Sequence, residues 1–371
     1  MKLTHNNIFY EGRFVTGSLE AEGGLITRID IENEEETGSL PYLLPGLVEA
    51  HSHGNSGADF SDGDYEGLKK MGRFYAANGV TSFAPTSMTL PYEVLAAAFS
   101  TAKEYRQEAV AGGAYLAGIH MEGPFFSEKK KGAQNGAYLR LPDFDAFEKL
   151  QKDCGGLVRI VDVAPELDGA AAFTEKAKKL CRVSVAHTDA NYEQAKAVFE
   201  AGASHLTHLF NAMPGIHHRN PGVIGAASEN KHIRAELICD GLHVHESAVR
   251  MAFKLFPGRI CLISDSLRCA GMPEGEYELG GQAIYLKNRS ARLADGTLAG
   301  SVITLLDGLK NAVRFGIDRE EAILSSTLRP AEELNIADKA GSLAPGKRAD
   351  MFLCDDAFTL REVFLAGDPI G

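Results

Sequence analysis

Six side chains that can bind a metal ion stand at or near the ends of short apolar runs in this sequence. They are four histidines and two carboxylates: His51, His53, Glu122, His187, His208 and Asp265. Imidazole and carboxylate together suit zinc, iron, manganese or nickel, without distinguishing among them. Buried groups of this kind are costly without a binding partner, and strand capping explains one or two of them rather than six. The pattern predicts a site for one or two divalent ions.

The spacing of the first two histidines and the position of Asp265 refine this prediction. Residues i and i+2 of a strand face the same way, so the His51-Ser52-His53 segment directs two imidazoles together. A carboxylate beside a metal-activated water can take up its proton and later pass it to a leaving group. We therefore expect Asp265 to act as general base and then general acid in a hydrolysis.

A repeating order of strands and helices is expected to position these residues. Eight apolar segments have strand character: 44–51, 80–85, 115–122, 158–164, 183–187, 205–208, 233–239 and 259–265. Helical patterns separate most of them: 64–78, 92–109, 143–152, 169–180, 192–201 and 246–255. This order implies a parallel sheet, and eight units over roughly 250 residues imply a (β/α)₈ barrel with its chemistry at the carboxyl ends of the strands. An open doubly wound sheet is the alternative, but the first strand lacks its Gly-x-Gly-x-x-Gly turn.

The two ends of the chain have a different pattern, with short strands and turns. Strand-like segments occur at 7–10, 13–16 and 24–31, and again at 349–354 and 362–366. Turn residues separate them, as at Glu11-Gly12. We predict an α/β protein with a (β/α)₈ barrel at 44–336 and a small β-sandwich domain built from 1–43 plus 337–371.

Composition excludes several classes of partner. The chain has 371 residues, a net charge of −12 and no long basic run, which argues against nucleic acid or an anionic membrane. Its six cysteines are scattered, without a Cys-x-x-Cys pair, as is typical of a reducing compartment. The N-terminus lacks the apolar core of a signal peptide, and no apolar run reaches the ~18 residues that span a membrane. We expect a cytoplasmic enzyme.

Several motifs resemble a known family. The run PGLVEAHSHG resembles the first-strand motif of the amidohydrolase superfamily, and GSLAPGKRADMFLCD resembles its return into the small β domain. HMEGPFFSEKKKGAQNG, AHTDA, THLFNAMPGIHHRNPGVIG, CDGLHV, LISDS and TLAGS resemble, in order and spacing, the N-acetylglucosamine-6-phosphate deacetylases of that superfamily. The resemblance covers nearly the whole chain.

This resemblance implies the removal of acetate from the acetamido group of N-acetylglucosamine 6-phosphate. It implies that Glu122, His187 and His208 are metal ligands and that Asp265 is the acid/base. It also implies a set of substrate contacts: Ala133, Gln134, Asn211, Ala212, Arg219, His243, Leu298, Ala299 and Gly300. The loop that carries Arg219 is similar to one that crosses a dimer interface, which implies a homodimer.

Two departures from the family pattern leave alternatives open. Some relatives have Gln-x-Asn in place of His51-x-His53 and a histidine in place of Gln134. The resemblance places this chain in the branch that tends to hold two metals, with Glu122 between them. Arg268, soon after Asp265, leaves the substrate open between N-acetylglucosamine 6-phosphate, N-acetylgalactosamine 6-phosphate and another N-acyl amine. A non-catalytic barrel is the remaining alternative, and the intact ligand set argues against it.

Overall fold

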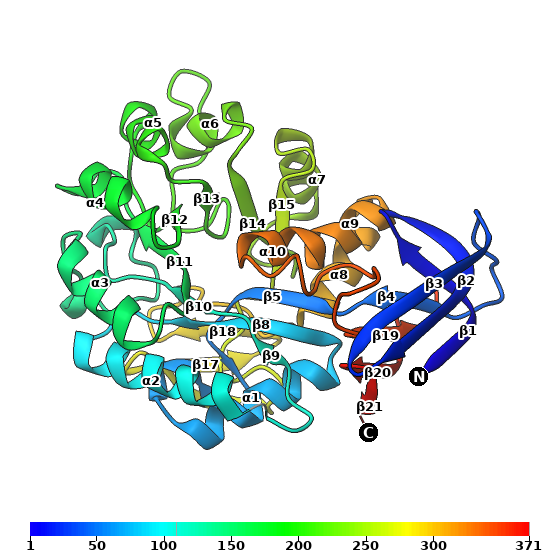
Figure 1. The fold of residues 1–371 in the computed structure, drawn as a ribbon. Helices are drawn as coiled ribbons and strands as arrows, with labels where there is room; N and C mark the ends of the chain where they lie inside the picture. The colour runs from blue at the N-terminus through cyan, green and yellow to red at the C-terminus, as the bar shows by residue number, and fades with distance from the viewer. Residues whose placement is uncertain (109, 371) are drawn as a thin grey trace.

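The strands of the barrel follow one another around it in chain order. In the computed structural model, which describes residues 1–108 and 110–370, they pair in parallel, each with its neighbour in the sequence. Their bounds are β5 (Leu47–Ser52), β8 (Val80–Ser87), β10 (Ile119–Met121), β11 (Val158–Val163), β12 (Arg182–Val185), β13 (His205–Leu206), β14 (Arg234–Ile238) and β15 (Ile260–Ile263). The sheet curls until β15 lies beside β5 (Figure 1), and the backbone N–H of Asp265 donates to the carbonyl oxygen of His51 at 2.9 Å across this seam. The predicted barrel is confirmed, as a nearly closed one.

Helices surround the barrel strands (Figure 1). Their bounds are α1 (Tyr65–Ala77), α2 (Tyr92–Glu108), α3 (Phe144–Asp153), α4 (Ala170–Ala177), α5 (Tyr192–Ala201), α6 (Gly222–Glu229), α7 (Glu246–Leu255), α8 (Leu305–Arg314), α9 (Arg319–Ser326) and α10 (Leu328–Glu333). Side-chain caps start several of them: Asp64 accepts from two backbone N–H groups of α1, and Asn191 forms a capping box with Gln194 in α5. The six predicted helices are confirmed, although the predicted end of α2 at residue 109 lies outside the described residues. Helices α6, α8, α9 and α10 were not predicted from the sequence.

The first predicted strand is two strands that belong to different sheets. β4 (Tyr42–Pro45) pairs with strands of the small sheet, and β5 pairs with β8 of the barrel. The chain crosses between them at Gly46, whose N–H donates to the carbonyl oxygen of Asp350 at 3.0 Å. A side chain does not fit there, because a Cβ atom at Gly46 would lie 2.0 Å from Thr81 Oγ1. The boundary predicted between residues 43 and 44 falls inside β4, and the division into domains stays a prediction.

The two ends of the chain come together in one small β unit, as predicted, and there they form a single mixed sheet. Its strands lie in the order β21 (Asp368–Ile370), β20 (Leu360–Leu365), β19 (Met351–Cys354), β4, β1 (Lys2–Tyr10), β2 (Arg13–Glu22) and β3 (Leu25–Asn33). Glu11 and Gly12 both have positive φ in the β1–β2 turn, as a tight hairpin requires. The sheet curls far enough for Leu25 to bridge Arg348, next to β19. Its core includes Ile8 and Met351, both fully buried.

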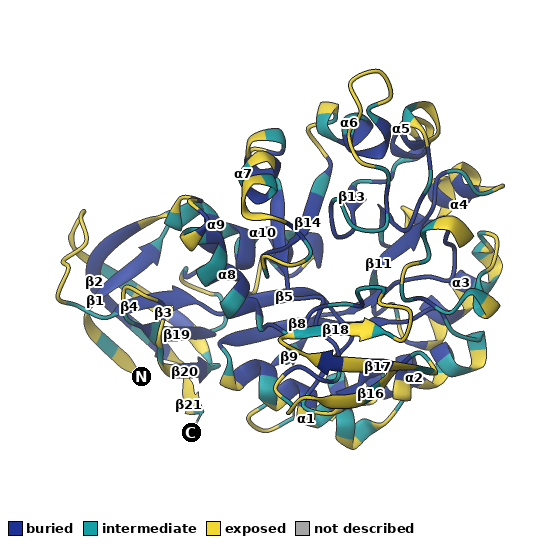
Figure 2. Ribbon diagram, turned by 180° about the vertical axis from the view of Figure 1, so that it is seen from behind, coloured by how far each residue is buried: buried dark blue, intermediate teal, exposed yellow. Residues whose placement is uncertain are grey.

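A three-stranded antiparallel sheet between β15 and α8 was not predicted. It consists of β16 (Gly275–Leu279), β17 (Gln282–Lys287) and β18 (Ser290–Leu293). Figure 2 shows the exposed outer face of β16 and β17, while residues such as Leu279 and Ile284 pack inward against Met88 and Leu267 of the barrel loops. The sheet therefore covers part of the barrel mouth. Shorter strands β6 (Gly54–Asn55), β7 (Ala58–Asp59) and β9 (Tyr115–Leu116) complete the fold.

The barrel interior contains an apolar layer and a polar layer. The apolar layer includes Val48, Ile160 and Ile263, and it packs against Ala331 and Leu334 at α10. The polar layer contains side chains that are fully buried: Glu49, His51, His120, Asp162, His205 and Glu236. Because barrel interiors are usually filled by branched apolar side chains, these charged and polar groups call for a function.

Candidate metal centre and active site

The structure brings all six predicted metal ligands together at the carboxyl ends of the strands. His51 lies in β5 and His53 just beyond it, whereas Glu122 directly follows β10. The other three come two residues after β12, β13 and β15, respectively: His187, His208 and Asp265. All six are at most 7 % exposed. Parallel strands present the same end to one side, and this is why residues up to 214 positions apart in sequence meet here.

Glu122 occupies the centre of the group. Its Oε1 lies 3.2 Å from His187 Nε2 and 3.1 Å from His208 Nε2. Its Oε2 lies 3.2 Å from His53 Nε2 and also accepts from the amide of Gln134 at 2.6 Å. Two sets of potential ligand atoms share this carboxylate: the first adds His51 and His53, and the second adds His187 and His208. A carboxylate in this position can bridge two ions.

Asp265 joins the first of these two sets. Its Oδ1 lies 3.4 Å from His53 Nε2 and 3.6 Å from His51 Nε2. Its backbone is held on both sides, because its N–H donates to His51 and its carbonyl oxygen accepts from Ser301 at 2.6 Å. Gly300 makes this approach possible, since a Cβ atom there would lie 2.6 Å from the carbonyl oxygen of Asp265.

The orientation of the rings fits a cation between them. The Nδ1 atoms of His51, His53 and His187 face acceptors that carry no proton: Glu236 at 2.8 Å, the carbonyl of Thr86 at 3.2 Å and the carbonyl of Lys130 at 2.9 Å, respectively. Each Nδ1 therefore carries a ring proton, and each Nε2, which points toward Glu122, is the ring atom left to bind a cation. Lone pairs and carboxylates that converge in this way repel one another unless a positive charge lies among them. Consistent with this, His51 Nε2 is buried without a hydrogen-bond partner.

The shifted pKa values of these groups also indicate that the cluster favours a positive charge. Burial lowers the pKa of His208, but the Glu122 carboxylate outweighs burial and raises it to about 9. Burial also lowers the pKa of His53, but the carboxylates of Asp265 and Glu122 outweigh burial and raise this pKa well above its ordinary value. Burial raises the pKa of Glu122, but His187, His208 and His53 bring it well below its usual range. Without a metal, protons take the place of the missing cation.

Three of the six residues have strained backbones. His187, His208 and Asp265 have φ values of 43°, 32° and 49°, in the left-handed region that non-glycine residues rarely adopt. Such strain persists where the surrounding structure imposes it, and it is concentrated at functional sites. At each of these positions it turns the side chain at the end of a strand into the common cluster.

A cavity of about 320 Å³ opens onto this cluster. Five of the six predicted metal ligands line it, and His51 lies behind them. Eight of the nine predicted substrate contacts line it as well: Ala133, Gln134, Asn211, Ala212, His243, Leu298, Ala299 and Gly300. Met88, Leu267 and Leu279 add an apolar wall that the sequence analysis missed.

Two arginines that the sequence analysis singled out lie elsewhere. Arg219 is exposed in the loop between β13 and α6, where its Nη1 lies 2.7 Å from His218 Nε2, and it does not line the cavity. Arg268 pairs with Asp62 at 2.7 Å and also does not line the cavity. Arg268 is therefore not placed to contact a bound substrate directly.

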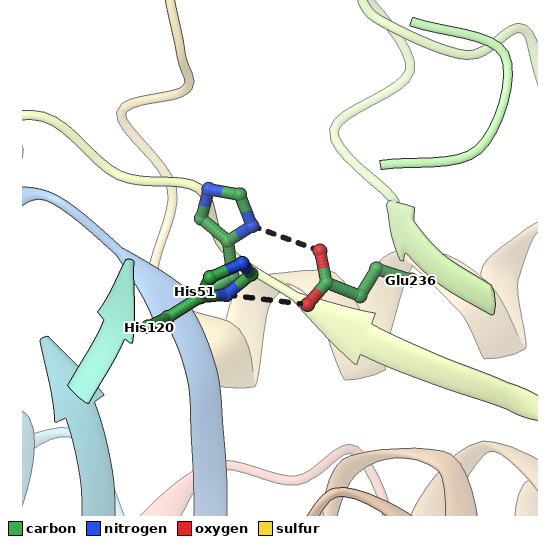
Figure 3. Close-up of side chains that lie close together, drawn as sticks. All are labelled: His51, His120 and Glu236. Carbon is green, nitrogen blue, oxygen red and sulfur yellow. Dashed lines mark hydrogen bonds and ion pairs between the residues drawn. The ribbon is translucent and has the colours of Figure 1, made fainter. Parts of the chain in front are cut away.

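Two buried or half-buried carboxylates outside the cavity, which were not predicted from the sequence, hold the cluster in place. Glu236 lies inside the barrel and accepts a hydrogen bond from His51, with His120 beside it (Figure 3). The carboxylate of Glu166, after β11, holds the loop that follows His187, through Thr188 and the backbone of Asp189. The signal in the sequence was a charged residue inside an apolar run, as in the segment around Glu236.

Comparison with known proteins agrees with this arrangement. The model of the amidohydrolase family matches residues 42–370. The chain is 40% identical over 317 residues to an N-acetylglucosamine-6-phosphate deacetylase of Bacillus subtilis, a match that covers 84% of this chain and 80% of that protein. It is 35% identical over 329 residues to an N-acetylgalactosamine-6-phosphate deacetylase of Escherichia coli O157:H7, covering 88% of this chain and 86% of that protein.

A solved structure extends the likeness to the whole fold. It is that of an N-acetyl-D-glucosamine-6-phosphate deacetylase mutant from Mycobacterium smegmatis in complex with N-acetyl-D-glucosamine-6-phosphate. The TM-score is 0.92 at 30% identity, over 100% of this chain and 98% of that one. A barrel that gathers buried histidines and carboxylates at the carboxyl ends of its strands is typical of a metal-dependent hydrolase. The chain belongs to the amidohydrolase family and, within it, to the N-acetylglucosamine-6-phosphate deacetylases.

The protonated state of the metal-free cluster leads to a prediction about metal affinity. Ligation needs neutral imidazole, and the pKa of His208 is about 9 in the metal-free protein, so at pH 7 its ring must lose a proton for an ion to bind. We expect zinc affinity to rise with pH from 6 to about 9, by about tenfold per unit for each proton displaced. Calorimetry at pH 7 in buffers of different ionisation enthalpy should record the release of at least one proton. A pH-independent affinity would show that His208 is not protonated in the metal-free protein at pH 7.

Proposed function

We propose that this protein hydrolyses N-acetylglucosamine 6-phosphate to glucosamine 6-phosphate and acetate. The observation that carries the proposal is the buried cluster of four histidines and two carboxylates at one end of the cavity. The likeness to deacetylases over nearly the whole chain supports the substrate class. In this reaction water adds to the acetamide carbonyl carbon, the C–N bond breaks and the amine leaves with a proton.

The donor set fits one or two divalent ions. His51, His53, Glu122 and Asp265 would hold one, and Glu122 with His187 and His208 would hold another. An ion in this site would polarise the substrate carbonyl and bring the pKa of water toward about 7. Zinc, iron, manganese and nickel all suit imidazole and carboxylate, and the donor set alone does not select among them.

Asp265 is the residue that we assign to proton transfer. Its Oδ1 faces the two histidines of the first set, and the residue also lines the cavity, so it can contact both water and substrate. Burial raises the pKa of this carboxyl, but His51 and His53 outweigh burial and lower it, so it is ionised at neutral pH and can accept a proton. It then donates that proton to the amide nitrogen, because an unprotonated amine is a very poor leaving group.

The rest of the cavity is assigned to the sugar. The backbone turns at Ala133, Asn211 and Ala212 and the Leu298–Gly300 segment surround the space next to the metal centre. The Nδ1 atom of His243 lies 2.6 Å from Asp240, which leaves Nε2 as the ring's other polar atom. Among the described residues, no lysine or arginine lines the cavity. The substrate phosphate, with about two negative charges in a protein of net charge −12, therefore lacks a permanent cation from this chain.

A homodimer would supply that cation. The loop of residues 215–220 is exposed throughout, and its His217, His218 and Arg219 do not line the cavity of their own chain. Ile216 in this loop and Leu242 in the loop after β14 are large apolar side chains about half exposed, at 50 % and 52 %. We propose that a second copy of the chain covers them and that Arg219 reaches the phosphate bound by that copy, beside its His243.

The compartment belongs to the same proposal. All six cysteines are unpaired and buried, which suits the reducing cytoplasm that the sequence analysis favoured. No helix among the described residues has the length and apolarity to cross a membrane.

The test of the proposed function is acetate release from two substrates with metal content measured on the same sample. Protein purified without chelator should hold at least about 0.7 ion per chain and release acetate from N-acetylglucosamine 6-phosphate. Preference for N-acetylgalactosamine 6-phosphate would favour the alternative, which the Escherichia coli relative supports. Full activity in a metal-free sample, or acetate release from neither sugar, would contradict the proposal.

Arg219 offers a second measurement. Charge-assisted contacts of this kind contribute about 1.5–3 kcal/mol, so Arg219→Ala should raise KM about 10–150-fold for the 6-phosphate. The rise should be much smaller for unphosphorylated N-acetylglucosamine, and equal losses would show that Arg219 does not contact the phosphate.

Mixing Arg219→Ala with Asp265→Asn chains should restore some activity if the site is shared between copies. No restoration would place each site within one chain.

A further inference from the structure

Glu236 on β14 is a carboxylate with no access to solvent or to the cavity. It is fully buried inside the barrel, where it faces His51 Nδ1 (Figure 3), whereas Glu122 lies near His51 Nε2. A buried carboxylate costs several kcal/mol unless its partners compensate it, and branched apolar side chains normally fill this space. Its contacts are therefore the guide to its function.

Both oxygens of Glu236 are committed to histidine residues around the metal centre. Oε2 accepts from His51 Nδ1 at 2.8 Å and lies 3.3 Å from the backbone N–H of His208, which also donates to it. Oε1 accepts from His205 Nε2 at 3.0 Å. One carboxylate thus ties a ligand on β5 to the strained backbone of a second ligand after β13.

Glu236 is itself held in place by His205 and, through that ring, by Glu333. His205 donates through Nδ1 to Glu333 Oε2 at 2.7 Å, so the ring is fixed between two carboxylates. Glu333 in turn pairs with Arg182 at 3.2 Å and Arg234 at 3.4 Å. The chain of contacts runs from the metal centre to α10 through charged groups, and it leaves Glu236 little freedom to shift.

The same three residues in Figure 3 do not make a metal site of their own. His120 faces the carbonyl of Ala50 at 3.2 Å through Nδ1 and the carboxylate of Asp162 at 3.0 Å through Nε2, so both of its nitrogens are engaged. The 2.8 Å between His51 Nδ1 and Glu236 is a hydrogen-bond distance that leaves no room for an ion between them. The cluster is a hydrogen-bonded support.

We propose that Glu236 is a positioning residue of the metal centre. It keeps the proton of His51 on Nδ1 and fixes the ring so that Nε2 points at Glu122 and Asp265, and it holds the backbone at His208. This inference rests on the proposed metal centre. A carboxylate behind a ligating histidine selects the tautomer and raises the basicity of the ligand, and its loss typically costs about 10–100-fold in metal affinity.

The experiment compares zinc affinities in competition with a chelating dye, on protein first stripped of metal. Glu236→Leu removes the acceptor and should weaken zinc binding about 10–100-fold, whereas Glu236→Gln keeps an acceptor oxygen and should recover most of the loss. Asp162→Asn is the matched control, because Asp162 is equally buried and its side chain holds those of His120 and Thr207, neither of which is a predicted ligand. It should stay within about threefold of the wild type. The thermal stability of each metal-free variant, measured alongside, reports on the fold independently of the metal.

A double-mutant cycle isolates the link to His51. In a His51→Ala background, Glu236→Leu should weaken zinc binding severalfold less than in the wild-type background, because the ring that Glu236 positions is gone and only its contact with the backbone of His208 remains to be lost. If Glu236→Leu does not fold, Glu236→Asp takes its place in the experiment. Aspartate keeps the negative charge but places it one methylene farther from His51, and zinc affinity should fall about tenfold. Wild-type affinity in the Glu236 variants, or an equal loss in Asp162→Asn, would overturn the inference while leaving the metal centre intact. A wild-type protein that binds no zinc or other divalent ion would instead refute the proposed function.

Discussion

Replacing Asp265 with asparagine is expected to lower kcat for acetate release by at least about 10²–10⁴-fold, the range that general acid–base catalysis contributes. Asparagine keeps the size of the side chain and can keep the hydrogen-bond geometry, but it cannot accept the proton of water or deliver one to the amide nitrogen. The loss can exceed this range, because Oδ1 also lies within 3.6 Å of His51 and His53 in the metal centre. KM should change far less than kcat, because the proton is transferred only during the reaction.

Metal content separates these two effects. If the variant keeps its ions and loses activity, the loss belongs to proton transfer; if it loses ions in proportion, Asp265 acts chiefly as a ligand. Asp189→Asn is a matched control near the end of another barrel strand, because Asp189 pairs with Lys129 and does not line the cavity. That control should stay within about twofold of the wild type. A variant at Asp265 that works within tenfold of the wild type would rule out the assigned role.

The clustering of the predicted metal ligands could be foreseen because the architecture is repetitive. Once alternating strands and helices indicate a parallel barrel, the carboxyl end of each strand must lie on one face, and a histidine or carboxylate at that end needs no further information to be placed. Glu122 and Asp265 are 143 positions apart in sequence, yet the strand ends alone bring them together. The predicted substrate contacts lie in loops whose paths the strand pattern does not determine, and only the family resemblance pointed to them.

The three-stranded sheet over the mouth had a signal that the sequence analysis did not use. Residues of β17 alternate between exposed and buried, and Gly280 and Gly281 both adopt positive φ in the turn between β16 and β17. A pair of glycines between alternating segments is a hairpin signal. The sheet was missed because it is an insertion that interrupts the alternation of strands and helices on which the barrel prediction depends.

Other features depend on contacts that no local pattern records. Glu236 is recognisable as a charged residue in an apolar strand, but its partner His51 is 185 positions away and lies on a strand that is not its neighbour. The first predicted strand divides between two sheets at Gly46. This residue must be glycine because Thr81 leaves no room for a side chain, and that contact is tertiary. For Arg219, a role at the phosphate depends on a second copy of the chain, which one sequence does not place.

The largest effect on the metal centre is expected from Glu122→Gln. Both groups of ligand atoms share this carboxylate, so the loss of its charge and of one of its oxygens weakens both positions at once. We expect metal content to fall below about 0.1 ion per chain and kcat/KM to fall by about 10³-fold or more, because the Lewis acid contributes several kcal/mol. The variant should also lose the rise in Tm that zinc gives the metal-free wild type, since that rise follows from binding to the folded state. Glu229→Gln makes the same change in α6, where the carboxylate accepts from Tyr192 instead, and it should keep both metal and the zinc-dependent Tm. Wild-type metal content in Glu122→Gln would show that the ions are held without Glu122, and the bridging assignment would then be wrong.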